Sequence, residues 1–246
     1  MANQDINNAR FTKEAAEWDN NKKHVESTQK AFEAIQRYVP AFQNGTNESL
    51  HVLEIGSGTG LLSFTLSPRV KTLVGVDTAD GMIAAFKTKL ADLQKPNLCT
   101  INHFLTTPDS RELQDACAAL QPGGQPPFRF DLVVSHLTLH HIPSMPEIFA
   151  LMFACLKPGG VVALTDYEDF GKEAIRFHPE SKRPGVERHG IRRDEARELL
   201  LQTGFKEVRV EEAFCLRKEV DDEEGLDKLD GKEMAFPFLM LYGVKG

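Results

Sequence analysis

Apolar positions along the chain follow two patterns, short continuous runs and sets spaced three or four residues apart. The short runs predict buried strands, and the wider spacing predicts amphipathic helices. The predicted strands cover residues 50–55, 72–76, 98–103, 130–135 and 160–165, and the predicted helices cover 60–66, 79–92, 110–120, 145–156 and 193–203. Strands that alternate with helices predict an α/β fold in which parallel strands are joined by right-handed crossovers.

Both ends of the chain extend this alternating region. Helix-like spacing recurs over residues 10–43, and further strands are predicted at about 206–212 and 238–244. The stretch between those two strands is dense in charge and is interpreted as a solvated excursion. The expected organisation is a single domain over 1–246, made of N-terminal helices (1–45), a core sheet (50–212 and 236–246) and a charged insertion (213–235).

The first predicted strand runs directly into a glycine-rich turn, and the whole stretch reads Val52-Leu-Glu-Ile-Gly-Ser-Gly-Thr-Gly60. Three glycines on alternate positions let a ligand approach the backbone, because no Cβ stands in its way. Asp77 ends the next predicted strand. A carboxylate about 20 residues beyond such a turn is typical of sites that hold the ribose hydroxyls of a nucleotide. The pattern predicts a cofactor that contains adenosine.

Two details favour S-adenosylmethionine over a dinucleotide as this cofactor. Pyrophosphate binders usually have the spacing Gly-x-Gly-x-x-Gly, whereas this chain has Gly-x-Gly-x-Gly. Glu54 stands two residues before the first glycine. An acid there would repel a pyrophosphate, but it suits a cofactor with a sulfonium and an ammonium group.

Composition narrows the possible partners. The net charge of −7 and the isoelectric point near 5.7 argue against a nucleic-acid partner, which requires a basic surface. No apolar segment approaches the roughly 18 residues needed to cross a bilayer, so no membrane partner is expected. The four cysteines form no Cys-x-x-Cys pair. Buried, reduced thiols and the lack of a secretory signal pattern favour a cytoplasmic protein.

Together these landmarks resemble the class I S-adenosylmethionine-dependent methyltransferases, in particular the branch that acts on small molecules. The resemblance covers about residues 50–212 and the last ten. Its motifs are Val52–Gly60, Gly75-Val-Asp77, Phe130-Asp-Leu-Val-Val-Ser135 followed by Thr138-Leu-His-His-Ile142, Leu156-Lys-Pro-Gly-Gly160 and Gly204-Phe205. Residues Ala16-Glu-Trp18-Asp19 are similar to the lid segment of several such enzymes.

The resemblance implies a Rossmann-like, mostly parallel sheet of seven strands in the order 3-2-1-4-5-7-6. The last strand would be antiparallel, and helices would cover both faces. The implied cofactor contacts are Glu54, Gly56, Ser57, Gly58 and Gly60 at the methionine end, Asp77 and Thr78 at the ribose, Met82 near the adenine, and Ser135 and His136 at the end of the fourth strand.

One departure from the family pattern concerns the adenine. Many members have an acid just after the third strand, but this chain has His103-Phe-Leu-Thr-Thr-Pro108. Thr106, Thr107 or a backbone carbonyl would have to replace that acid.

Histidine is the usual base near neutral pH, and two groups of residues could supply one here. His136, His140 and His141 follow the fourth strand. Asp166 and His178 lie in the stretch 166–192, which shows no regular pattern over 170–191 and is interpreted as a substrate loop. The predicted catalytic residues are His141, His140, Asp166 and His178. The alternative is that they only hold the loops in place.

The same four residues could instead surround a metal ion, since histidine and carboxylate suit zinc or a similar divalent ion. Some quinone-pathway methyltransferases carry a metal on a Glu-x-x-Glu-His run at the corresponding place. This chain has Leu137-Thr-Leu-His-His141 there, so both acids are missing. No metal is predicted on this ground.

The resulting hypothesis is a methyltransferase that moves a methyl group to an oxygen, nitrogen or sulfur atom of a small metabolite by in-line displacement. Its expected oligomeric state is a monomer or a homodimer. A protein methyltransferase, a non-catalytic binding subunit of the same fold and a nicotinamide-dependent dehydrogenase are the alternatives.

Overall fold

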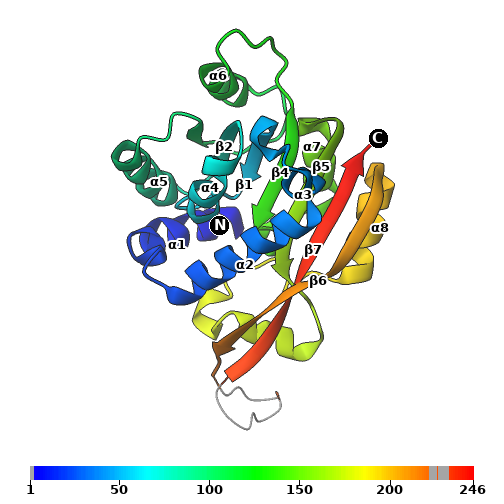
Figure 1. Ribbon diagram of the computed structural model, residues 1–246. Coiled ribbons are helices and arrows are strands. Elements are labelled where there is room, and N and C mark those ends of the chain that lie inside the picture. The colour runs from blue at the N-terminus through cyan, green and yellow to red at the C-terminus, as the bar shows by residue number, and fades with distance from the viewer. Residues whose placement is uncertain (1–2, 222–225, 227–232) are drawn as a thin grey trace.

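The computed structural model describes residues 3–221, 226 and 233–246, and within them a mixed sheet forms the centre of the molecule (Figure 1). Its seven strands have the order β3-β2-β1-β4-β5-β7-β6. They are β1 (His51–Ile55), β2 (Thr72–Asp77), β3 (Leu98–Asn102), β4 (Phe130–His136), β5 (Leu156–Tyr167), β6 (Phe205–Glu219) and β7 (Glu233–Lys245). In this described sheet β7 runs antiparallel to both of its neighbours, β5 and β6, and all other strand pairs are parallel. The strand order and the antiparallel last strand predicted from the sequence are confirmed.

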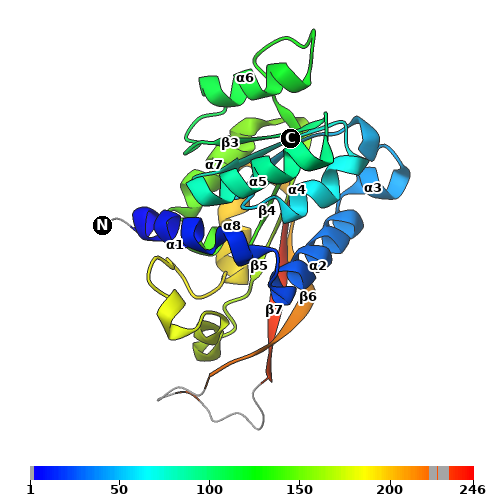
Figure 2. The same cartoon turned by 90° about the vertical axis from the view of Figure 1, so that its left-hand side faces the viewer.

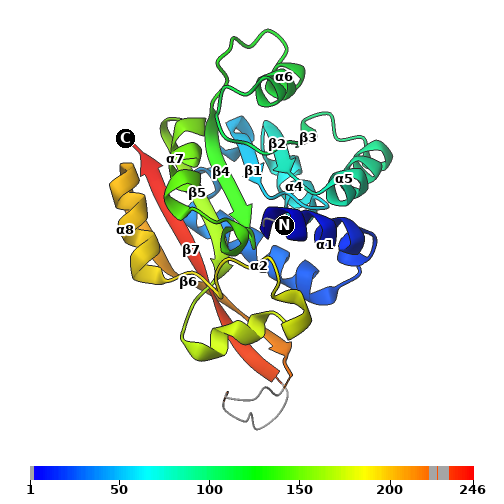
Figure 3. The same cartoon turned by 180° about the vertical axis from the view of Figure 1, so that it is seen from behind.

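Helices cover both faces of the sheet, as predicted. The helices α6 (Arg111–Leu120), α7 (Met145–Cys155) and α8 (Arg193–Thr203) contribute to one hydrophobic cluster. On the other face, α2 (Lys22–Tyr38), α4 (Leu61–Leu66) and α5 (Asp80–Leu93) contribute to a second cluster. Figure 1 looks onto the face with α2, and Figure 3 shows α7 and α8 from behind. The short helix α3 (Pro40–Asn44) follows α2.

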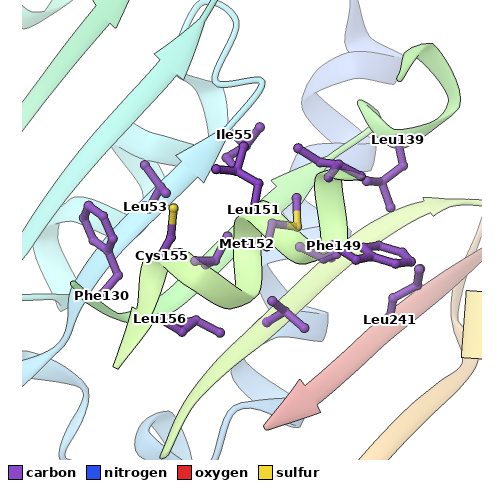
Figure 4. Close-up of a cluster of buried hydrophobic side chains, with 14 of the residues drawn as sticks. Leu53, Ile55, Phe130, Leu139, Phe149, Leu151, Met152, Cys155, Leu156 and Leu241 are labelled. Carbon is purple, nitrogen blue, oxygen red and sulfur yellow. The ribbon is translucent and has the colours of Figure 1, made fainter. Parts of the chain in front are cut away.

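Side-chain alternation along β1 shows how the sheet divides this core. Leu53 belongs to the cluster under α7, whereas its neighbour Val52 belongs to the cluster under α2. Figure 4 shows Met152 and Cys155 of α7 gathered with Leu53 and Phe130 of the sheet. Complete burial of such a side chain contributes about 1.5–3 kcal/mol. This packing makes β1, β2 and β4 a rigid support for the loops at their carboxyl ends.

The structure differs from the sequence prediction at the end of β6. This strand continues to Glu219 and pairs with β7 down to Glu233, so residues 213–219 and 233–235 of the predicted charged insertion belong to the sheet. The reason is that Phe214 and Leu216 pack with Phe236 and Phe238, a contact that the charged residues on both sides of the run 213–216 conceal in the sequence. Residues 222–225 and 227–232 of that prediction lie outside the described residues.

β5 also begins earlier than predicted, at Leu156 instead of residue 160, so it includes Pro158 and Gly159, which are residue types typical of turns. Gly159 has a φ of +76°, and the register of β4 with β5 shifts between Phe130 and Leu132. The apparent turn is therefore an irregularity at the start of a long strand.

The N-terminal helix α1 (Asn3–Trp18) lies across α5 rather than on the sheet (Figures 1 and 2). The two helices touch closely at Gly81, where a Cβ would lie 2.4 Å from the backbone oxygen of Thr12. Figure 2 shows the 170–192 segment on the same side of the molecule as α1. Among the described residues, no helix has the length and apolar character needed to span a bilayer.

Candidate functional site

A cavity of about 1200 Å³ opens at the carboxyl ends of β1, β2 and β4. Ligand pockets usually enclose about 300–1,000 Å³, so this cavity can hold a cofactor together with a second molecule. Open parallel sheets bind ligands at this edge. Its walls come from the turn after β1, the end of β2, the segments after β3 and β4, the helices α1 and α2, and the 177–182 stretch.

The glycine turn after β1 brings bare backbone to the cavity. Gly56 and Gly58 have φ angles of +75° and +53°, which favour glycine. A Cβ on Gly56 would lie 2.2 Å from Oγ1 of Thr138, whereas one on Gly58 would meet only Met82, at 4.0 Å. Position 56 therefore needs glycine for packing, and position 58 leaves open space for a ligand. The hydroxyl of Ser57 is buried and has no hydrogen-bond partner in the described structure.

Glu54 lines the same end of the cavity although its side chain is almost fully buried. The hydroxyl of Ser63 donates a hydrogen bond to its carboxylate. Burial raises the pKa of Glu54 to about 8, and the nearby charge of Asp77 adds to the rise. A positively charged group in the cavity would favour the ionised carboxylate.

Asp77 stands at the end of β2 and holds the glycine turn in place. Its carboxylate accepts hydrogen bonds from the backbone N–H groups of Gly58 (2.8 Å) and Ala79 (2.9 Å). Burial raises the pKa of Asp77, although these hydrogen bonds partly oppose the rise. The hydroxyl of the next residue, Thr78, interacts with Gln4 and Asn8 of α1.

The part of the cavity beyond the glycine turn and Asp77 is more apolar. Met82 lies buried between Ala15 and Ala79, and Thr106 lines the cavity from an exposed position. Phe104, which the sequence analysis did not single out, is 63% exposed and also lines the cavity. An exposed aromatic ring at this position offers a flat surface to an adenine base.

Two predicted cofactor residues, Gly60 and Ser135, lie outside the cavity lining. The Ser135 hydroxyl donates a hydrogen bond to the Ile55 carbonyl at 2.7 Å and is buried between strands. Gly60 is covered by Phe86, since a Cβ there would lie 2.7 Å from its ring. The side chain of Ser135 links β4 to β1, and Gly60 lets α4 begin beside α5.

His136 does line the cavity, at the end of β4. Its Nδ1 lies 2.8 Å from the Thr165 hydroxyl, and its Nε2 lies 3.3 Å from the Ser27 hydroxyl. Burial lowers the pKa of His136 to about 4, so the ring is neutral near pH 7. With both nitrogens engaged, His136 forms part of the cavity wall at the end of β4.

The four predicted catalytic residues come together although they are up to 38 positions apart (140 to 178). His140 and Asp166 form a buried pair, with Nδ1 of the ring 2.8 Å from one carboxylate oxygen. Asp166 also accepts hydrogen bonds from the backbone N–H groups of His140 and Tyr167. Asp166 is fully buried and does not line the cavity, so its contact there is with His140, and its catalytic role stays a prediction.

His141 and His178 complete this group, which we call the histidine cluster (His140, His141 and His178). The ring centroid of His140 lies 4.0 Å from that of His141 and 5.0 Å from that of His178. All three rings line the cavity. Burial, together with the neighbouring imidazoles, lowers the pKa of His141 and His178. His141 and His178 therefore present neutral imidazoles to the cavity.

Arg188 holds the histidine cluster in place, a role that the sequence analysis missed. Its guanidinium donates hydrogen bonds to the backbone carbonyls of Leu139 and Ile142, both at 2.6 Å. The backbone N–H of Arg188 and of Glu187 donate to the His140 carbonyl. No local sequence pattern could reveal this, because the contacts join segments nearly 50 residues apart.

The helices α1 and α2 close the cavity from the outside. Asn7 donates a hydrogen bond to the Gly185 carbonyl at 2.8 Å, which ties α1 to the 166–192 segment. Trp18 stacks on His24 with ring centroids 3.9 Å apart, and Asp19 accepts a hydrogen bond from the Thr59 hydroxyl. Phe11 places its ring 5.2 Å from that of His141. These contacts cover both halves of the cavity.

Comparison with known proteins agrees with this geometry. Residues 22–210 match a family described as a methyltransferase domain. An uncharacterised methyltransferase of Schizosaccharomyces pombe is 29% identical over 145 residues, which cover 57% of this chain and 48% of that protein. Phosphoethanolamine N-methyltransferase 1 of Zea mays is 27% identical over 177 residues, covering 69% of this chain and 32% of that protein. The chain thus spans less than half the length of these curated relatives.

A solved structure shows the same fold over the whole chain. Magnesium protoporphyrin IX methyltransferase from Synechocystis PCC 6803, solved with bound S-adenosylmethionine, superposes with a TM-score of 0.61. It is 14% identical, and the match covers 100% of this chain and 98% of that chain. The family match covers more than half of the chain and confirms the resemblance seen in the sequence. The chain therefore belongs to the methyltransferase-domain family, whose methyl donor is S-adenosylmethionine.

Proposed function

We propose that this protein is an S-adenosylmethionine-dependent methyltransferase that acts on an oxygen, nitrogen or sulfur atom of a small metabolite. One observation carries the proposal: a single cavity joins the glycine turn, Glu54 and Asp77 to the histidine cluster. A methyl donor and an acceptor need such a shared space, because the reaction is an in-line displacement between them.

The cofactor half of the cavity supplies a matching group for each part of the methyl donor. Glu54, with the open backbone at Gly58, would hold the cationic methionine end. Asp77 would accept hydrogen bonds from the ribose hydroxyls, and Met82 and Phe104 would contact the adenine, with Thr106 beside it. His136, which closes this half, would separate the cofactor from the acceptor.

The acceptor half favours a small molecule over a peptide chain. It is covered by α1 and by the 166–192 segment, which are tied together through Asn7 and Gly185. Phe11, Trp18 and Phe177 give it apolar walls beside the histidine cluster. A phosphoethanolamine N-methyltransferase among the relatives is consistent with a small acceptor.

The residues of the chain act mainly by alignment and by exclusion of water. When bound, S-adenosylmethionine supplies a methyl group on a positively charged sulfur. The histidine cluster would hold the acceptor atom in line with that methyl group. Closure by α1 and Trp18 would keep water out, so the aligned acceptor is the nearest nucleophile.

A labelling experiment tests the proposed function. The protein is incubated with methyl-labelled S-adenosylmethionine and separately with the small-molecule and the protein fractions of a cell extract. We expect label to enter the small-molecule fraction. Label in the protein fraction alone would show a protein methyltransferase. Cofactor binding without any transfer would show a binding subunit.

The raised pKa of Glu54 predicts that cofactor affinity depends on pH. At pH 6 the free protein holds a proton on Glu54, because its pKa is about 8. The cationic cofactor favours the carboxylate, so binding releases this proton and the affinity rises with pH. Between pH 6 and 7.5 we expect a rise approaching tenfold per pH unit, measured by calorimetry with S-adenosylmethionine.

Glu54→Gln should remove this pH dependence and bind the cofactor about tenfold more weakly at pH 7.5. The matched control is Glu48→Gln, since Glu48 is an exposed acid outside the cavity and should leave the slope unchanged. If the cofactor affinity of Glu54→Gln still rises with pH in the same way, the proton released on binding comes from another group.

We expect the cofactor to dissociate faster when α1 is removed. Deletion of residues 1–20 takes away Phe11, Trp18 and the hydrogen bonds to Thr78 and Gly185. We expect the dissociation rate of S-adenosylmethionine to rise about tenfold, because a lid of this kind controls ligand release. Stopped-flow displacement by S-adenosylhomocysteine measures it.

Gly81→Ala tests the same idea without shortening the chain. The added Cβ would lie 2.4 Å from the Thr12 backbone and push α1 away from α5, although alanine favours the helix itself. Asp80→Ala, at the neighbouring exposed position, is the control. Equal dissociation rates in all of these proteins would show that α1 does not act as a lid.

A further inference from the structure

The histidine cluster has an arrangement that a single proton acceptor does not need. One ring nitrogen from each of His140, His141 and His178 lies within 4.8 Å of the other two. Nε2 of His140 and Nδ1 of His141 are buried and have no hydrogen-bond partner in the described structure. A buried polar atom left without a partner costs about 1–3 kcal/mol. Two such atoms in one cluster point to a ligand that satisfies both.

The partners of the rings determine which nitrogen is free. Asp166 accepts the hydrogen bond from Nδ1 of His140, so the unpartnered Nε2 carries the lone pair. His141 hydrogen-bonds to the backbone of Gly185, and its Nδ1 is left over. Nδ1 of His178 lies 3.4 Å from the Tyr167 hydroxyl, which leaves its Nε2 for the cavity. Each ring is therefore held from behind and offers one lone pair to a common point.

We propose that His140, His141 and His178 bind one divalent transition-metal ion of the zinc type, with Asp166 behind His140 and the fourth position open to the cavity. Three histidines and one open position form a known arrangement for reactive zinc. A carboxylate that holds the other ring nitrogen of a ligand histidine is its usual support. Zinc–nitrogen bonds of about 2.0–2.1 Å require the three nitrogens to lie closer together than 4.8 Å, so the rings would have to turn toward the ion when it binds.

This site deepens the proposed function, on which its role in the reaction rests, by selecting the class of acceptor. A hydroxyl or thiol that binds the open position loses its proton to solvent water more easily, because the metal stabilises the anion. The anion keeps further lone pairs and attacks the methyl carbon: the new carbon–oxygen or carbon–sulfur bond forms as the carbon–sulfonium bond breaks. S-adenosylhomocysteine and a methyl ether or thioether result. An amine would use its one lone pair on the metal, so we infer a hydroxyl or thiol acceptor.

Cobalt(II) binding tests the metal site without any acceptor. The full-length protein is freed of metal with a chelator and then titrated with Co²⁺ while its visible spectrum is recorded. We expect one Co²⁺ per chain, with the bands of a four-coordinate ion bound by nitrogen and no sulfur-to-metal band in the near ultraviolet. Zn²⁺ should displace it. Absence of stoichiometric binding, or a sulfur band, would overturn the proposal.

Variants locate the bound ion. His178→Ala should remove stoichiometric binding, and Asp166→Asn should weaken it about 10- to 100-fold. His51→Ala is the matched control, because His51 lies at the other end of β1 and should bind Co²⁺ like the unmodified protein. Binding that survives in His178→Ala would overturn the site, provided that thermal unfolding shows a folded variant.

The same experiment separates the two proposals. Methyl transfer that continues in the absence of bound metal refutes the role of the ion in the reaction and leaves the proposed function intact. Stoichiometric Co²⁺ binding that depends on His178, in a protein that binds no S-adenosylmethionine, would refute the proposed function and retain the site. Transfer only to amines would refute the inferred acceptor class.

Discussion

His141→Ala should lower the initial rate of label transfer to the small-molecule fraction about 100- to 1000-fold. His141 lies in the proposed acceptor half, where its ring contacts Phe11 and His140, and in the described structure it has no hydrogen bond to the glycine turn or Asp77. Its loss removes a group that holds the acceptor atom, whether the imidazole acts directly or through a metal ion. The affinity for S-adenosylmethionine should therefore change by less than about threefold.

The comparison of rate with affinity decides the role of His141. A loss of both by similar factors would mean that the imidazole only supports the cavity. His51→Ala is again the control, since His51 hydrogen-bonds to Thr72 far from the cavity and should retain both values. Thermal unfolding of each variant checks that the fold survives the substitution.

The sheet was predictable because its signals are local. Each strand of the parallel part is a short apolar run that ends at a turn, and the family resemblance added the strand order. β6 was predicted too short for a physical reason: the short apolar run 213–216 has charged residues on both sides, and only the partner side chains of β7 show which face is buried. A pattern of local charge cannot supply that information.

The site was predictable to the extent that it depends on residues near strand ends. Gly56, Gly58 and Asp77 line one half of the cavity because each follows a strand of the parallel sheet. Ser135 also lies near a strand end, but its side chain points to Ile55 instead of the cavity. Sequence gives the position along a strand, whereas side-chain direction at its last residues depends on the neighbouring strand.

Long-range contacts account for the rest of the site. The sequence suggested that His140, Asp166 and His178 could meet, and the structure shows Asp166 behind His140 instead of inside the cavity. The support from Arg188 depends on the path of the 166–192 segment, which has little regular structure. Chain segments of this kind follow tertiary contacts, so no local pattern predicts their course.

Asp77→Ala should weaken the binding of S-adenosylmethionine about 100-fold, because in the proposed binding mode the two ribose hydroxyls would lose a charged acceptor. The geometry supports an additional loss. Both oxygens of Asp77 accept backbone hydrogen bonds, from Gly58 and Ala79, so the carboxylate also fixes the glycine turn that receives the cofactor. Removal of the carboxylate therefore takes away a direct partner of the ribose and loosens the backbone at Gly58. Calorimetry with S-adenosylmethionine measures the affinity.

Asp77→Asn separates these two contributions. Asparagine keeps one oxygen for a backbone N–H but lacks the charge and the second acceptor, so its affinity should lie between those of Asp77→Ala and the unmodified protein. Asp80→Ala removes an exposed acid three residues away and should bind like the unmodified protein. If Asp77→Ala also bound normally, the ribose could not rest on this carboxylate. Because Asp77 is the acid that ends β2 beside the glycine turn, that result would move the adenosine away from the edge where the parallel strands end.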